Sequence, residues 1–172
     1  GGRLLVFQRM DGAMWAGVYG SQGKAVASAS FGRPSGDMTE RAEHPTFRAI
    51  VAHSDDGLDE ISISAPTTLW HVEHGEIHEE HVCPEDAGLS TQPIESVTAG
   101  DLDEATRMIL SILEGTEHGA PLDMVLMNAG GAMLAAGAVC SLSEGVKAAR
   151  EVIEGGAAME TLSRLGDVSH LA

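Results

Sequence analysis

Residues 49–60 read AIVAHSDDGLDE, a short apolar run that leads directly into an acidic loop. A continuous apolar run of this length is typical of a buried β-strand, so we expect a strand over residues 49–53. Gly57 provides a turn in the loop. Residues 61–64 then alternate apolar and polar side chains before Pro66, which predicts a second, half-buried strand.

A β-hairpin is predicted next. Residues 67–73 and 76–82 flank His74-Gly75, a pair that suits a two-residue hairpin turn. With this turn, Glu73 lies opposite Glu76 and His71 lies opposite His78.

Helices follow a polar stretch over residues 84–100. Asp101 and Ser141 each precede a glutamate by three residues, the spacing of a capping box at a helix start. A run of small residues, Ala129-Gly130-Gly131-Ala132, would let its helix approach a neighbour closely. We expect helices over residues 101–113, 123–136, 141–154 and 157–165, and the whole pattern predicts an α/β fold.

The net charge of the chain limits its possible partners, and the distribution of charge along the sequence differs between two parts of the chain. The 172 residues carry a formal net charge of −16, which argues against nucleic acid and anionic membrane as partners. Residues 1–48 hold six basic and four acidic side chains, whereas residues 49–172 hold four basic and 22 acidic ones. We therefore expect a change of character at about residue 48, with 1–47 as a separate segment and 48–172 as the α/β region.

The cellular location follows from what the sequence lacks. No apolar run approaches the roughly 20 residues that span a bilayer, and the start is not a signal peptide. Two cysteines, Cys83 and Cys140, are too few for a disulfide scaffold, so a reducing cytoplasm is expected. Neither has a signature of a nucleophile around it, and each is interpreted as an indifferent thiol.

The acidic loop is the first candidate site. Adjacent carboxylates repel one another unless a cation or hydrogen-bond donors lie among them, which suits a hard metal such as magnesium. A calcium EF-hand is excluded, because Pro66 stands where its last glutamate would be. The alternative is a solvated acidic turn. The acidic residues are Asp55, Asp56, Asp59 and Glu60.

The hairpin is the second candidate site, because histidines and glutamates alternate along it. Opposed side chains in a hairpin come within about 5 Å at Cβ, so His71 and His78 could chelate a transition metal together with Glu73 or Glu76. The favoured alternative is a polar outer surface of an acidic protein. The other histidines and glutamates of this candidate site are His74, His81, Glu79 and Glu80.

Seven segments, in order along the chain, resemble anthranilate phosphoribosyltransferases. They are residues 53–62 (HSDDGLDEIS), 73–77 (EHGEI), 84–89 (PEDAGL), 99–101 (AGD), 123–129 (DMVLMNA), 143–146 (SEGV) and 155–158 (GGAA). The resemblance covers about residues 48–165.

The resemblance implies part of a nucleoside phosphorylase/phosphoribosyltransferase-like α/β domain, with a mixed sheet flanked by helices. It implies transfer of the phosphoribosyl group of phosphoribosyl diphosphate to anthranilate, in tryptophan biosynthesis, with Mg²⁺ as cofactor. The magnesium-binding Asp-Glu pair of the family falls on Asp59 and Glu60. A homodimer is implied where the helical domain of the family is present.

The departures from the family pattern concern catalysis. The sequence contains no Gly-Thr-Gly-Gly-Asp phosphate loop and no Lys-His-Gly-Asn segment, and Ala105 stands near a position where the family has Asn. We therefore expect little turnover by this chain alone, as for a truncated, frameshifted or divergent gene start. The alternatives are a non-catalytic metal-binding or interaction module that uses the histidine hairpin, and a related nucleoside phosphorylase.

Overall fold

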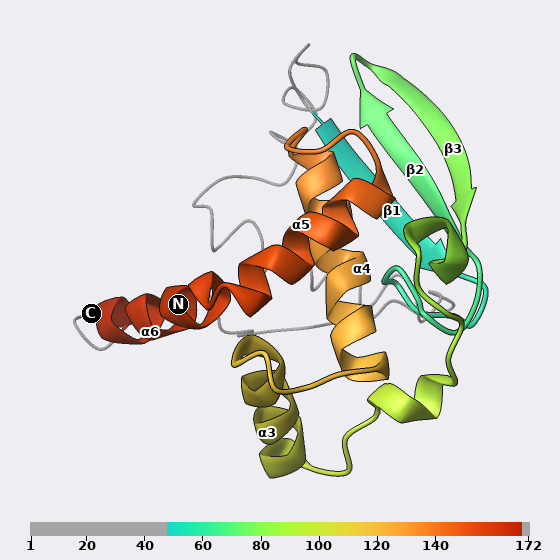
Figure 1. Cartoon of the computed structure of the whole chain (residues 1–172). Helices are drawn as coiled ribbons and strands as arrows, with labels where there is room; N and C mark the ends of the chain where they lie inside the picture. The colour runs from blue at the N-terminus through green and yellow to red at the C-terminus, as the bar shows by residue number, and fades with distance from the viewer. Residues whose placement is uncertain (1–47, 170–172) are drawn as a thin grey trace, which may run out of the picture. The chain divides into compact units, whose positions relative to one another are not determined.

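The computed structural model describes residues 48–169, so the predictions for residues 1–47 lie outside the described residues. The described part is α/β, as the sequence predicts (Figure 1). Its strands are β1 (Arg48–Ser54), β2 (Thr67–Glu73) and β3 (Glu76–Val82), followed by the short 3₁₀ helices η1 (Pro84–Ala87) and η2 (Ile94–Val97). The α-helices are α3 (Leu102–Leu113), α4 (Ala120–Ala135), α5 (Leu142–Glu154) and α6 (Ala157–Ser169).

The three strands form an antiparallel sheet in the order β1-β2-β3. The predicted hairpin is confirmed, because His71 pairs with His78 and Glu73 pairs with Glu76. His74 and Gly75 at the turn have φ angles of 55° and 79°. Positive φ at both central residues is what a two-residue type I′ turn requires.

The strand predicted over residues 61–64 is wrong. These residues form a largely buried but irregular segment between β1 and β2. The backbone N–H of Ser62 donates to Thr67 Oγ1 (3.1 Å), and the N–H of Ser64 donates to Ser62 Oγ (2.9 Å). Because side chains satisfy these groups and β1 pairs directly with β2, the segment has no place in the sheet.

The four predicted helices are present, but the first residue of α4 and the last residue of α6 differ from the prediction. Asp101 and Ser141 accept hydrogen bonds from the backbone N–H groups of Glu104 and Glu144, as N-caps do. Helix α4 begins at Ala120 rather than at residue 123, since a proline is favourable in the first turn of a helix. Helix α6 continues through Gly166 to Ser169, four residues beyond the predicted end.

Helix α4 packs against β1 on one face of the sheet, and α5 packs against α4, so that the sheet and both helices contribute to the core (Figure 1). Leu69 of β2 and Leu126 of α4 are fully buried there. The two helices touch through their backbones, because a Cβ on Gly130 would lie 2.8 Å from the backbone nitrogen of Val146 and one on Gly145 would lie 2.6 Å from the Gly130 oxygen. The predicted close approach of small residues is therefore confirmed. Within residues 48–169, no helix is long and apolar enough to cross a membrane.

Candidate functional site

The acidic loop begins where β1 ends, and backbone hydrogen bonds close it. The N–H of Ser54 donates to the oxygen of Leu58 (2.9 Å), and the N–H of Gly57 donates to the oxygen of Ser54 (2.9 Å). Gly57 has a φ of 93°, which a side chain would make unfavourable. The turn is therefore set by β1 and by the glycine.

Asp56 fastens the loop to the segment that follows it. Its Oδ1 accepts from the N–H of Leu58 (3.2 Å), and its Oδ2 accepts from the hydroxyl of Ser62 (2.6 Å) and from that of Ser64. Burial raises the pKa of Asp56, but these hydrogen bonds to the ionised form outweigh it and lower the pKa to about 2. This carboxylate is occupied by the protein itself.

Asp59 and Glu60 are exposed like Asp56, but they differ from it in their contacts. Neither makes a hydrogen bond or an ion pair with another residue of the described part of the chain. Two adjacent carboxylates without donors repel each other, and a cation would relieve that repulsion.

The residue after this pair is held by helix α4. The N–H of Ile61 donates to Asn128 Oδ1 (2.9 Å), and Asn128 Nδ2 donates to the oxygen of Ile61 (3.0 Å). The Ile61 side chain is buried over Gly131, where an added Cβ would lie 2.5 Å from Ile61 Cδ1. The buried end of the loop is thus fixed to the helix.

The side chains of the loop suit magnesium better than a metal that needs three or more protein ligands. Among residues 48–169, no group of three His, Cys, Asp or Glu side chains lies together so that it could hold a metal ion. Mg²⁺ usually keeps several waters and is bound by one or two carboxylates together with substrate phosphates. Asp59 and Glu60 fit that pattern, and Asp55, although exposed in the same loop, completes no cluster.

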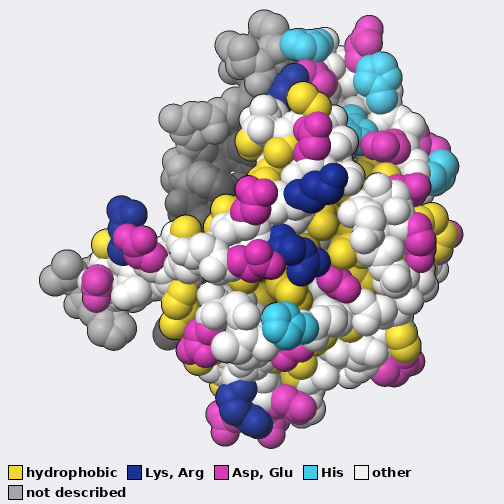
Figure 2. Space-filling model, in the orientation of Figure 1, with side chains coloured by type: hydrophobic (Ala, Val, Ile, Leu, Met, Phe, Trp, Pro, Cys, Tyr) yellow, Lys and Arg dark blue, Asp and Glu magenta, His cyan; other side chains and the backbone are white. Residues whose placement is uncertain are grey.

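The histidine hairpin forms no group of three possible metal ligands among residues 48–169, and its imidazoles lie singly beside carboxylates. His71 Nε2 lies 2.8 Å from Glu80 Oε2, and the distances from His78 Nε2 to Glu76 Oε2 and from His81 Nε2 to Glu79 Oε1 are 3.5 and 3.4 Å. Figure 2 shows histidine and acidic side chains intermixed over this part of the surface. The favoured interpretation, a polar surface, agrees with this pairing.

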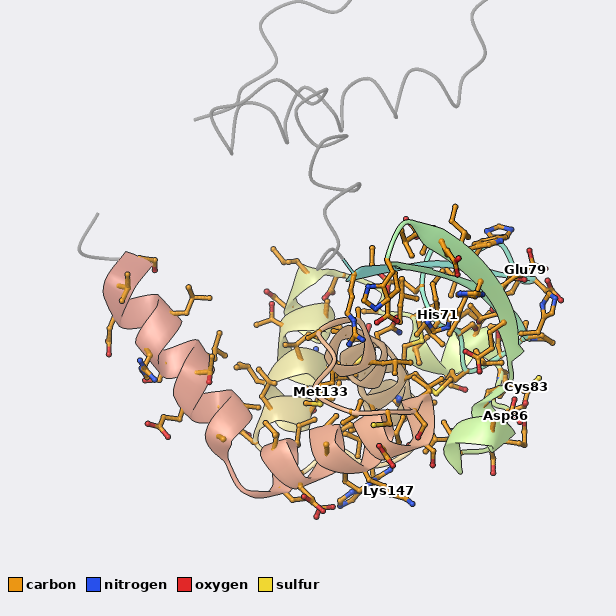
Figure 3. The ribbon with its side chains drawn as sticks, turned by 90° about the horizontal axis from the view of Figure 1, so that it is seen from above. His71, Glu79, Cys83, Asp86, Met133 and Lys147 are labelled. Carbon is orange, nitrogen blue, oxygen red and sulfur yellow. The ribbon has the colours of Figure 1, made fainter. Side chains whose placement is uncertain are left out.

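A cavity of about 230 Å³ lies at the other end of β1, between the sheet and the end of α4. Figure 3 shows His71 on the side of the sheet that faces the helices. The polar groups of this cavity are paired, Arg48 with Glu73 and His71 with Glu80. Cys140 at its edge is exposed, Cys83 is half-buried, and both are free thiols.

The sequence places Asp56 among the candidate carboxylates and Asn128 in a segment that resembles the family, but it predicts no positioning role for either residue. A polar amide within the apolar run of α4 is a signal for Asn128, because such a group needs hydrogen-bond partners. No local signal identifies Ile61 as its partner, since the two residues are 67 positions apart.

Three comparisons place the chain among known proteins. The family model described as "Glycosyl transferase family, a/b domain" matches residues 26–159. That match begins before the boundary predicted at residue 48, and the boundary stays a prediction.

Two curated relatives are both anthranilate phosphoribosyltransferases. The one from Symbiobacterium thermophilum is 44% identical over 122 residues, 71% of this chain and 36% of the relative. The one from Rubrobacter xylanophilus is 38% identical over 144 residues, 84% of this chain and 42% of the relative. The chain thus spans roughly two fifths of the length of these relatives.

Solved structures carry the same family name. The anthranilate phosphoribosyltransferase of Thermus thermophilus aligns with a TM-score of 0.59 at 35% identity, covering 68% of this chain and 34% of that one. The enzyme of Saccharomyces cerevisiae in complex with PRPP and Mg aligns with a TM-score of 0.61 at 21% identity, covering 83% and 37%. At that identity the second likeness shows the fold alone.

Proposed function

The chain belongs to the glycosyl transferase family with an a/b domain, and from this we propose that its acidic loop binds the magnesium ion that accompanies phosphoribosyl diphosphate in an anthranilate phosphoribosyltransferase. One observation carries the proposal. Asp59 and Glu60 are adjacent and exposed, without a partner in the described residues, on a loop that is fixed on both sides. The name of the relatives supports it, as does the yeast enzyme, which was solved in complex with PRPP and Mg.

The loop explains why a cation would be needed. Two carboxylates repel an anionic diphosphate, so Asp59 and Glu60 would bind such a ligand only when a cation lies between them. When bound, magnesium would neutralise the negative charge that develops on the leaving diphosphate. Asp59 and Glu60 would supply anionic oxygens from a loop whose backbone is fixed, and the other ligands would be water and phosphate.

The reaction of the whole enzyme is a broader part of the proposal. We propose residues 48–172 as the α/β region of the domain and anthranilate as the acceptor, on the strength of the relatives' name. Since the sequence contains no Gly-Thr-Gly-Gly-Asp phosphate loop, we expect little or no phosphoribosyl transfer when this chain alone is assayed with both substrates and magnesium. Transfer at the rate of a full-length relative would contradict this.

Cation binding tests the central proposal directly. The chain is titrated with Mn²⁺ as a paramagnetic substitute, and broadening of backbone amide signals in NMR spectra reports the site and its affinity. The double variant Asp59→Asn/Glu60→Gln should weaken binding about tenfold or more, the scale at which metal sites respond to the loss of supporting groups.

The matched control is Glu79→Gln/Glu80→Gln, which removes two adjacent carboxylates from the hairpin. Since these two acids are already paired with Trp70 and His71, affinity at the loop should stay close to that of the unchanged chain. Equal affinity in the Asp59→Asn/Glu60→Gln variant would overturn the proposal.

A further inference from the structure

The two candidate ligands sit between two anchored residues. Leu58 precedes the pair and Ile61 follows it. A side chain holds the backbone of each, that of Asp56 in the same loop for Leu58 and that of Asn128 in α4 for Ile61. Asp59 and Glu60 themselves are exposed. The loop therefore combines a fixed backbone with free side chains.

The first anchor is Asp56. One carboxylate oxygen accepts from the N–H of Leu58, and the other accepts from the hydroxyls of Ser62 and Ser64. Ser62 is fully buried, and its own N–H is held by Thr67 at the start of β2. Asp56 thus connects the exposed turn to the buried segment on the far side of the acidic pair.

The second anchor is Asn128, whose amide is completely used. Its oxygen accepts from the N–H of Ile61, and its two amide hydrogens go to the oxygens of Ile61 (3.0 Å) and Met124 (3.0 Å). The orientation of the amide is unambiguous, because one partner is a donor and the other two are acceptors. Helix α4 thereby binds the backbone of Ile61 on both sides.

We propose that Asp56 and Asn128 are positioning residues that hold the backbone of Asp59 and Glu60 ready for a cation. This inference rests on the proposed function. A flexible loop would lose conformational freedom when the ion binds, which weakens binding, whereas a loop ordered on folding has already lost it. Partners behind metal ligands commonly control affinity in this way.

The test compares two variants with a control of equal charge. Asp56→Asn weakens the first anchor, because it replaces the oxygen that accepts from the Ser62 and Ser64 hydroxyls by an NH₂ donor. Asn128→Ala removes the second anchor. Asp55→Asn is the control, because Asp55 is exposed in the same loop and its side chain makes no hydrogen bond to the described residues. Asp56→Asn and Asp55→Asn remove the same charge, so any difference between them reports the anchor.

Two measurements are made on each variant. Mn²⁺ affinity at the loop should fall about tenfold in Asp56→Asn and in Asn128→Ala, and much less in Asp55→Asn. Without metal, hydrogen exchange at the amides of Leu58 and Ile61 should accelerate in the matching variant, while the buried amide of Leu69 in β2 keeps its protection. If Asn128→Ala does not fold, Asn128→Ser replaces it, since a hydroxyl with a single hydrogen cannot make all three bonds of the amide and the charge is unchanged.

The outcomes separate the inference from the function beneath it. Suppose that the unchanged chain binds Mn²⁺ at the loop, that Asp56→Asn has the Mn²⁺ affinity of Asp55→Asn, and that the Asn128 variant has the affinity of the unchanged chain. The positioning role is then overturned, and the metal site stands. If the unchanged chain does not bind Mn²⁺ at the loop, the proposed function fails and the inference fails with it.

Discussion

The acidic loop and the histidine hairpin are both rich in carboxylates, but these carboxylates differ in whether other side chains bind them. In the hairpin, Glu79 and Glu80 are occupied by side chains of the neighbouring strand, Trp70 and His71. In the loop, Asp59 and Glu60 have no such partner in the described residues, although the backbone around them is fixed. Charge density alone therefore does not identify a binding site. What distinguishes one is charge that the protein holds in place and leaves unsatisfied.

The largest expected effect is a loss of unfolding free energy when the anchor of the acidic loop is removed. Asn128→Ala leaves the N–H and the oxygen of buried Ile61 without their partner. An unsatisfied buried polar group costs about 1–3 kcal/mol, so the free energy of unfolding should fall by roughly 2–3 kcal/mol in urea titration. Thr106→Ala is the control, since it removes an exposed hydrogen bond within α3. Equal losses in the two variants would show that Asn128 does not anchor the loop.

A smaller effect should appear at acid pH. The folded pKa of Asp56 lies at about 2, below its ordinary value of 3.8. The stability that ionised Asp56 contributes is therefore complete above about pH 4 and is lost as the pH falls through about 2. Urea titrations should show the advantage of the unchanged chain over Asp56→Asn narrowing across that interval. A constant difference would mean that the contacts of Asp56 do not depend on its charge.

The smallest effect is expected in the hairpin. Glu80→Gln replaces the carboxylate that lies 2.8 Å from His71 Nε2 by an amide. The His71 side chain is 25% exposed and that of Glu80 is 54% exposed. Exposed pairs contribute about 0–1 kcal/mol, so the midpoint of urea unfolding should hardly move. A loss comparable with that of Asn128→Ala would erase the distinction between the two regions.

Local pattern was sufficient for much of the fold. The hairpin register follows from the two-residue turn at His74-Gly75, and two helix starts follow from Asp101 and Ser141. The failure at residues 61–64 has a physical reason. Alternation predicts a strand, but the hydrogen bonds that a strand would need are taken by side chains such as Thr67 and Asn128.

The site was predictable only in part, for a related reason. Resemblance assigned Asp59 and Glu60, and that assignment stays a prediction. The anchors depend on contacts between distant parts of the chain, because Asn128 is 67 residues from Ile61. Single-sequence patterns report neighbours within one element, whereas this contact exists only after α4 has packed against the loop.

The two consecutive glycines of α4 have a mechanical consequence. Gly130 touches α5 and Gly131 touches Ile61, each without a side chain between. The backbone of α4 at these two glycines therefore sets the distance between α5 and Ile61 at the end of the acidic loop. Any residue larger than glycine at position 130 or 145 would wedge α4 away from α5 and shift Asn128 with it. A substitution at that helix crossing would thus be transmitted to the acidic pair, although neither position touches it.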